Sequence, residues 1–284
     1  MENQFSDLTG LPNLRIPTIE PLSTGKIALH DADYIKYLVT SRVFKNCKDG
    51  YYPPPDQYIK DILEALFTRI HDPIIFCFSS LSSKTFRYHL ASEMEYKGSR
   101  KFREDTQYYD RKSEDAYYVV EYIKKSFIVL MFGDLEADDI VSALQDDNTY
   151  IMSKDKDLKQ VPGWHYSFTE NSLFHISQEQ GLLFLANQLI KGDGGDDICG
   201  IKGFGEKASE KILKGVQPNR LIQTVLHEYH KKYGLVMGTD MFSEMWQLLK
   251  TKINRGDYFK EKYALMFTTK NIILNDIKSK ETEI

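Results

Sequence analysis

The stretch FIVLMFGDLEADD, residues 127–139, decides the fold because it joins an apolar run directly to a group of acidic residues. Its first six residues are continuously apolar, which is typical of a parallel strand covered by helices on both faces of a sheet. Three further runs share this character: 26–30 (KIALH), 73–78 (PIIFCF) and 149–153 (TYIMS). We therefore predict an α/β fold with a mostly parallel central sheet and flanking helices.

Helical patterns fill the segments between these runs and most of the second half of the chain. In the first half they cover 33–43, 56–71, 111–126 and 136–146. From about residue 177 the strand signal weakens, and helical patterns cover 178–191, 206–216, 219–233 and 241–253. These patterns predict an irregular arm over 1–25, an α/β core over 26–192 and a helical region over 193–284.

Composition excludes several classes of protein. Hydrophobic residues make up 42% of the 284 residues, which excludes wholesale disorder, and the net charge of −4 excludes a uniformly basic surface for nucleic acid. Three cysteines without metal-ligand spacing form neither a disulfide framework nor a zinc site. The first twenty residues lack the features of a signal peptide, and no apolar run is long enough to span a membrane. We therefore expect a soluble, cytoplasmic protein.

Acidic residues follow the predicted strands at the point where each strand ends. They are Asp31 and Asp33 after the first run, Glu136, Asp138 and Asp139 after the third, and Asp155 and Asp157 after the fourth. The carboxyl ends of parallel strands meet at one edge of a sheet, so we expect these side chains to converge. A further group, Asp193, Asp196 and Asp197, lies in a glycine-rich stretch.

Converging carboxylates need cations to neutralise them. Ligation by oxygen atoms alone suits Mg²⁺ or Mn²⁺, and two such ions are a common device for cleaving phosphodiester bonds. The alternative is that each acid only stabilises the start of a helix through the helix dipole. Repetition after three strands favours the metal site.

Basic residues gather in the segment 96–103, YKGSRKFR. Lys97, Arg100, Lys101 and Arg103 follow Tyr96 within this short stretch of an otherwise acidic protein. Such a segment can contact nucleic-acid phosphates opposite a metal cluster. The alternative is a charged helix face exposed to solvent.

The stretch GIKGFGEK, residues 200–207, could be a phosphate-binding loop of a nucleotide-binding protein. Its spacing does not fit, because Glu206 and not lysine follows Gly205. Two helices joined by a glycine turn better fit a hairpin whose backbone N–H groups hold a DNA phosphate. An ordinary turn with glycine caps is the alternative.

The order of these motifs resembles the 5′-to-3′ exonuclease and flap endonuclease superfamily. The matching motifs are DxD, YKGSRK, EADD, SKDKD and GDGGDDICGIKGFGEKA, and they extend from about Lys26 to Ile212. The resemblance is greatest to short bacteriophage exonucleases and to the nuclease domain of bacterial DNA polymerase I.

The resemblance implies a metal-dependent nuclease core over 26–192, a helical arch around 84–126 and a helix–three-turn–helix within 193–284. It implies hydrolysis of DNA at or near a 5′ end or a 5′ flap, in replication, primer removal or DNA degradation. Two Mg²⁺ ions, replaceable by Mn²⁺, would be held by Asp31, Glu136, Asp138, Asp139, Asp155, Asp157, Asp193 and Asp196.

It also implies how the substrate is held. Lys97 and Arg100 would contact the scissile phosphate, and a potassium ion would assist the Gly200–Gly205 turn. The substrate would be duplex DNA with a 5′ end, nick or flap, or an RNA–DNA hybrid, bound by a monomer. The DNA-binding residues would be Tyr96, Lys101, Arg103, Gly200, Lys202, Gly203, Gly205, Lys207 and Lys211.

One departure from the family pattern lies at the end of the second predicted strand. The family usually has an aspartate there, whereas this chain has Ser79 and Ser80 ahead of Phe86 and Arg87. Ser80 occupies the expected position or a neighbouring one, and a hydroxyl brings no charge to a metal. The alternative function is therefore a DNA-binding relative with a weakened metal site.

Overall fold

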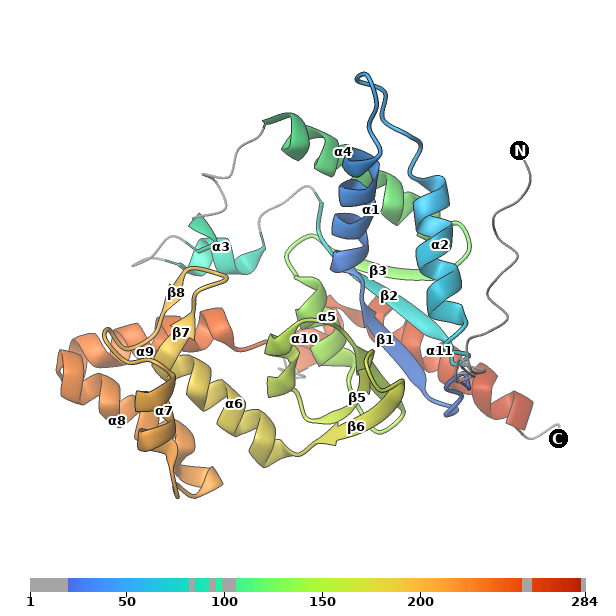
Figure 1. The fold of residues 1–284 in the computed structure, drawn as a ribbon. Helices are drawn as coiled ribbons and strands as arrows, with labels where there is room; N and C mark the ends of the chain where they lie inside the picture. The colour runs from blue at the N-terminus through green and yellow to red at the C-terminus, as the bar shows by residue number, and fades with distance from the viewer. Residues whose placement is uncertain (1–19, 82–84, 92–95, 99–105, 252–256, 282–284) are drawn as a thin grey trace, which may run out of the picture.

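A six-stranded sheet forms the centre of the computed structural model, which describes residues 20–81, 85–91, 96–98, 106–251 and 257–281 (Figure 1). The order across the sheet is β3-β2-β1-β4-β5-β6; the first five strands are parallel and β6 is antiparallel. The four predicted strands are confirmed. The strands are β1 (Ile27–Asp31), β2 (Ile74–Ser79), β3 (Ile128–Phe132), β4 (Thr149–Met152), β5 (Gly163–Ser167) and β6 (Ser172–Ile176).

The hairpin of β5 and β6 was not predicted from the sequence. Its strands, GWHYS and SLFHI, mix polar and apolar residues because they lie at one side of the sheet and are only partly buried. The turn between them contains Asn171 at φ +51°, a left-handed conformation that asparagine tolerates better than most residues. Asn171 N–H donates to the carbonyl of Ser167, which closes the turn at 2.9 Å.

Helices cover both faces of the sheet, as predicted. On one face, α1 (Asp33–Lys45), α2 (Asp56–Phe67) and α4 (Thr106–Lys124) bury a core with β1, β2 and β4. On the other face, α5 (Ala137–Leu144) and α11 (Ala264–Glu281) bury a second core, which includes Met266 and Ile273. The last helix of the predicted helical region therefore covers the sheet, and the short helix α10 (Asp257–Lys262) precedes it.

The remaining elements build a helical half with a core of its own (Figure 1). Helix α3 (Phe86–Leu90) packs against α9 (Leu235–Leu249), and a 3₁₀ helix η2 (Lys156–Gln160) packs against α6 (Gln178–Lys191). Helix α6 begins at Ser177, whose hydroxyl accepts from Gln180 N–H at 3.1 Å in a capping box. The further elements are α6 (Gln178–Lys191), β7 (Gly192–Asp193), β8 (Ile198–Cys199), α7 (Glu206–Leu213), η3 (Pro218–Arg220), α8 (Leu221–Tyr233) and α9 (Leu235–Leu249).

Among the residues that the structure describes, no helix combines the length and the apolar character needed to cross a membrane.

Candidate metal centre

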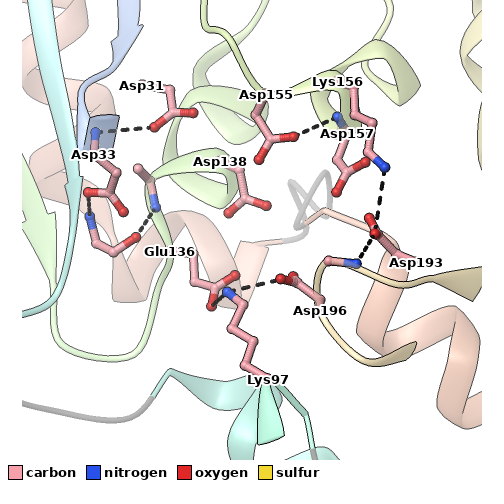
Figure 2. Close-up of a pocket in the computed structure, with 13 residues that line it drawn as sticks. Asp31, Asp33, Lys97, Glu136, Asp138, Asp155, Lys156, Asp157, Asp193 and Asp196 are labelled. Atoms are coloured by element: carbon pink, nitrogen blue, oxygen red, sulfur yellow. Dashed lines mark hydrogen bonds and ion pairs between the residues drawn. The ribbon is translucent and has the colours of Figure 1, made fainter. Parts of the chain in front are cut away.

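An acidic pocket of about 370 Å³ lies where β1, β2 and β4 end (Figure 2). All the carboxylates predicted as metal ligands line this pocket except Asp139. Asp33 lines it as well, together with Ser79, Lys97 and Lys156. The acids at the lining are Asp31, Asp33, Glu136, Asp138, Asp155, Asp157, Asp193 and Asp196.

The ends of strands and the first turns of helices aim these acids at the pocket. Asp31 is the last residue of β1, and Glu136 is the N-cap of α5. Asp155 is the N-cap of η2 and accepts from Asp157 N–H at 2.8 Å. Asp193, on β7, accepts from Gly195 N–H at 2.8 Å. The pocket is thus built from segments that are far apart in the sequence.

Asp139 differs from its neighbours because it turns into the protein interior. Its side chain is fully buried, and its two oxygens accept from Arg87 at 2.7 and 2.9 Å. Its oxygens come within 4.8 Å of those of Glu136 and Asp138, but Asp139 does not line the pocket. Asp139 thus pairs with a buried guanidinium beside two pocket acids, and its role as a metal ligand stays a prediction.

Arg87 is a site residue that the sequence analysis did not assign. Its side chain is 2% exposed and lies 2.8 Å from an oxygen of Glu136 and 3.8 Å from one of Asp138. A buried arginine offers five N–H donors in a fixed plane, which suits it to join several carboxylates. The only sequence signal was its place in the Phe86-Arg87 pair of the family pattern.

Lys97 reaches the pocket from the segment 96–98 (Figure 2). Its Nζ lies 2.9 Å from Glu136 Oε1 and 3.6 Å from Asp196 Oδ2, and its backbone N–H donates to Asp196 O at 2.9 Å. The lysine expected to contact the scissile phosphate thus lies at the acidic pocket. Arg100, Lys101 and Arg103 lie outside the described residues.

Tyr96 does not present its ring to solvent, as a DNA contact would require. The side chain is 3% exposed, and its hydroxyl donates to Asp196 Oδ2 at 3.1 Å and to Glu136 Oε2 at 3.2 Å. This corrects the expected role of Tyr96. The hydroxyl holds two pocket acids in place because a buried tyrosine O–H needs an acceptor.

Burial, together with the crowding of like charges, raises the pKa values of several pocket acids. Burial, with Asp33 and Asp155 nearby, raises the pKa of Asp31 to about 7. Burial, with Asp155 and Asp193 nearby, raises the pKa of Asp157 to about 7 as well. Burial and the neighbouring Asp139 raise the pKa of Asp138 well above its usual range. The pocket therefore holds more negative charge than its own side chains can neutralise.

Two acids have the opposite shift because cations or N–H donors contact them. Burial acts to raise the pKa of Glu136, but Arg87 and Lys97 outweigh it and hold that pKa below its usual value. Burial likewise opposes the lowering of the Asp193 pKa, which hydrogen bonds and Lys156 produce. In the described residues, the pocket lining has eight carboxylates and two lysines. The carboxylates form an all-oxygen set of ligands, which fits hard divalent cations.

Ser79, and not Ser80, lines the pocket at the end of β2. Its N–H donates to Asp33 Oδ1 at 3.0 Å, and its hydroxyl accepts from the N–H of Ala137 at 2.9 Å. The position predicted for Ser80 is thus taken by its neighbour. The Ser79 hydroxyl caps the start of α5, where a carboxylate would also be stabilised.

The glycines of the 200–205 turn have different surroundings. A Cβ on Gly200 would collide with the carbonyl of Ile190, and one on Gly192 would collide with that of Ile198, so the two backbones touch. This corrects the expectation that Gly200 meets a phosphate. Gly203, at φ +87°, and Gly205, the N-cap of α7, are exposed with open space beside them.

The lysines predicted to bind DNA beside this turn are exposed. Lys207 and Lys211 belong to α7, which begins directly after Gly205. Lys202 lies within the turn, and its N–H donates to the hydroxyl of Tyr233 at 2.7 Å, which ties the turn to the end of α8. The turn and α7 thus combine three exposed lysine side chains with open space beside Gly203 and Gly205.

Hydrogen bonds from less obvious residues fix the pocket acids. Ser153 Oγ donates to Asp31 Oδ2 at 2.7 Å, and Thr85 Oγ1 donates to Glu136 Oε1 at 3.0 Å. Gln188, buried on α6, donates to Asp157 Oδ1 at 2.7 Å. Sequence reasoning assigned none of them. Of the three, only Ser153 belongs to a recognised motif, as the first residue of SKDKD.

The sequence matches no protein-family model and no curated protein. Solved structures do match. The zinc-bound T5 5′-exonuclease aligns over 89% of this chain and 97% of its own, with a TM-score of 0.56 and 17% identity. The bacteriophage T5 D15 flap endonuclease in complex with DNA and metal ions aligns over 89% and 99%, with a TM-score of 0.55 and 18% identity.

The chain has the fold of these T5 5′ nucleases. T5 D15 protein co-crystallised with metal ions agrees, with 19% identity, a TM-score of 0.54 and coverage of 89% and 98%. This similarity confirms the fold class predicted from the sequence. At such low identities the 5′ nuclease fold is what the comparison shows, so the chemistry rests on the pocket.

Proposed function

We propose that this protein is a divalent-metal-dependent nuclease that hydrolyses DNA phosphodiester bonds at or near 5′ ends or 5′ flaps. The observation that carries the proposal is the pocket with eight carboxylates, which Lys97 enters from the 96–98 segment. Mg²⁺ or Mn²⁺ would be held by seven of these carboxylates: Asp31, Glu136, Asp138, Asp155, Asp157, Asp193 and Asp196. Bound there, two such ions supply an activated water and stabilise the leaving oxygen of the cleaved bond.

The protein groups have separate tasks in this proposal. Lys97 offsets negative charge on the reacting phosphate, and its ammonium exchanges Glu136 for a phosphate oxygen when substrate binds. Arg87 stays buried and neutralises Glu136 and Asp139, so that these acids can be crowded together without a bound cation. Tyr96 holds Glu136 and Asp196 in fixed orientations.

Duplex DNA is the proposed substrate. The turn before α7 would bind its backbone at a site separate from the pocket. Exposed Gly203 and Gly205 allow the backbone to approach a phosphate, and Lys202, Lys207 and Lys211 add positive charge. The T5 D15 flap endonuclease of similar fold was solved with DNA and metal ions. Arg100, Lys101 and Arg103 stay predicted contacts. Binding of RNA–DNA hybrid, potassium at the turn, a monomeric state and a cytoplasmic location also stay predictions.

The test is cleavage of 5′-labelled flap, nicked, blunt and RNA–DNA hybrid duplexes in Mg²⁺, in Mn²⁺ and in chelator. We expect cleavage near the 5′ end that leaves 5′-phosphate products and stops in chelator. Asp138→Asn protein prepared in parallel excludes a contaminating nuclease. Absence of cleavage of every substrate in both metals would contradict the proposal.

A DNA-binding module without cleavage is the second candidate function. Ser79 favours it, because the pocket has a hydroxyl where the family pattern has an acid. The same substrates decide between the candidates when binding is measured beside cleavage. Tight binding of flap or nicked duplex without metal-dependent cleavage would select the binding module.

A further inference from the structure

The C-terminal end of α9 is completed by two buried side chains from other elements, Arg87 of α3 and Gln160 of η2. The last carbonyls of an α-helix have no partner within the helix. Here Leu248 O accepts from Arg87 Nε at 2.9 Å, and Leu249 O accepts from Gln160 Nε2 at 3.0 Å. Gln160 Oε1 in turn accepts from Thr251 N–H at 3.1 Å.

These two side chains also contact the segments that carry the pocket acids. Arg87 pairs with Glu136 and Asp139 in the segment that begins α5. Gln160 Nε2 donates to the carbonyl of Asp157, at 3.1 Å, within η2. Both side chains are buried, at 2% and 4% exposure. One helix end is therefore bonded to both acid-bearing segments, 136–139 and 155–157.

The other end of α9 belongs firmly to the helical half. A Cβ on Gly238 would come 2.7 Å from the carbonyl of Tyr229, so α8 and α9 lie in backbone contact. Tyr229 is buried and donates to Leu189 O of α6 at 2.7 Å. Helix α9 therefore belongs to the packed helices of this half (Figure 1), and its last carbonyls accept from Arg87 and Gln160.

We propose that the C-terminal end of α9 sets the spacing between the two acid-bearing segments, and that Gln160 is a positioning residue for metal binding. This proposal rests on the proposed function, because it assumes that the pocket holds divalent cations. Carboxylates that repel one another move apart unless neighbouring bonds fix them, and residues behind the ligands commonly tune metal affinity. Gln160 and Arg87 supply such bonds from a common anchor.

Gln145 offers a matched control for Gln160. It is also a buried glutamine, at 3% exposure, and its Nε2 donates to a backbone carbonyl, that of Trp164, at 3.1 Å. Its Oε1 accepts from Thr149, and neither contact belongs to the pocket. Gln160→Met and Gln145→Met each remove an amide of the same size from a buried site. Their general effects on folding should be alike.

The experiment measures Mg²⁺ binding by titration calorimetry on full-length protein and its two variants, with no DNA present. We expect Gln160→Met to weaken Mg²⁺ binding at least roughly tenfold, as loss of a residue behind the ligands typically does, and Gln145→Met to leave it unchanged. Thermal unfolding in chelator should show both variants folded. Cleavage assays should show that Gln160→Met needs more Mg²⁺ while DNA binding is kept.

Equal Mg²⁺ affinities for the wild type and Gln160→Met would overturn the proposal, and so would equal losses in both variants. If Gln160→Met does not fold, Gln160→Asn replaces it; this variant keeps the amide but is one carbon too short to span both carbonyls. Wild-type protein that binds Mg²⁺ but cleaves no DNA would refute the nuclease function alone. Wild-type protein that binds no Mg²⁺ would refute both.

Discussion

The ammonium group of Lys97 lies 2.9 Å from Glu136 Oε1, although Lys97 stands in a short segment between α3 and α4 and Glu136 begins α5. Lys97 has a left-handed backbone, with φ at +55°. This conformation costs roughly 1 kcal/mol or more for a residue with a side chain. The backbone bond to Asp196 O and the contact with Glu136 offset that cost and fix the lysine at the pocket.

Lys97→Ala should reduce turnover by about two to three decades with little loss of DNA affinity, because a positioned cation acts mainly on the charge of the reacting phosphate. Single-turnover cleavage and filter binding separate the two effects. Lys156→Ala is the control, since Lys156 also lines the pocket but is largely exposed. Equal effects of both variants, confined to binding, would show that Lys97 only adds to a basic surface.

Asp138→Asn should abolish cleavage and leave DNA binding intact or tighter. Asp138 faces the pocket, and its loss removes one of the carboxylates that a bound cation needs. Cleavage assays measure this outcome. Near-normal turnover of Asp138→Asn in Mg²⁺ would remove Asp138 from the metal site.

Asp139→Asn should lower the free energy of unfolding by about 3 kcal/mol, because it breaks a buried pair and leaves Arg87 short of a partner. Urea denaturation measures this change.

Lys207→Ala and Lys211→Ala should weaken DNA binding and leave single-turnover cleavage at saturation unchanged. Each lost phosphate contact should reduce the slope of log affinity against log salt by about one. Fluorescence anisotropy over a series of salt concentrations gives this slope. Lys60→Ala, at an exposed position on α2, removes the same charge elsewhere and should leave the slope as it is.

Metal-free protein should lose stability as pH rises from about 4 to about 7. In this window the unfolded chain has released the protons of Asp31 and Asp157, whose ordinary pKa is 3.8, while the folded protein, with pKa values of about 7, retains them. Mg²⁺ should therefore raise the melting temperature more at about pH 8 than at about pH 6, since binding must displace these protons. Melting curves in chelator and in Mg²⁺ test this. Asp31→Asn should flatten the dependence in chelator.

Ser79→Asp should lower the Mg²⁺ concentration needed for half-maximal cleavage. The new carboxylate would lie at the pocket lining and at the N-terminal end of α5, where both a cation and the helix dipole stabilise it. Ser80→Asp is the comparison, because the pocket lining includes Ser79 but not Ser80. A Mg²⁺ titration that does not change in Ser79→Asp would show that the end of β2 contributes nothing to metal binding.

The sheet and the acids at its edge could be predicted because both leave direct patterns in the sequence. The buried strands β1, β2 and β4 appear as continuous apolar runs. The edge strand β3 has the same apolar pattern although it is partly exposed. The segments after these strands place Asp31, Asp138 and Asp155 at one edge. The hairpin of β5 and β6 escaped this reasoning because strands at the side of a sheet are only partly buried and carry mixed residues.

Residue roles that depend on side-chain direction could not be predicted. Asp138 and Asp139 are neighbours on one helix turn, and only packing decides that the second turns inward to Arg87. In the same way, the aromatic residue Tyr96 was expected to face DNA, but its ring fills a core. Gln160 and Gln188 act through hydrogen bonds to segments distant in sequence, which no local pattern records.

The contact between Gly192 and Gly200 has a consequence for how this chain tolerates mutation. Asp193 and Asp196 lie between these glycines, in the hairpin of β7 and β8. The two backbone segments approach so closely at the glycines that neither position has room for a side chain. A library of random substitutions should therefore lose variants at these two glycines as severely as at the carboxylates themselves. Any homologue that keeps this hairpin should therefore keep glycine at both positions, even where the acidic residues differ.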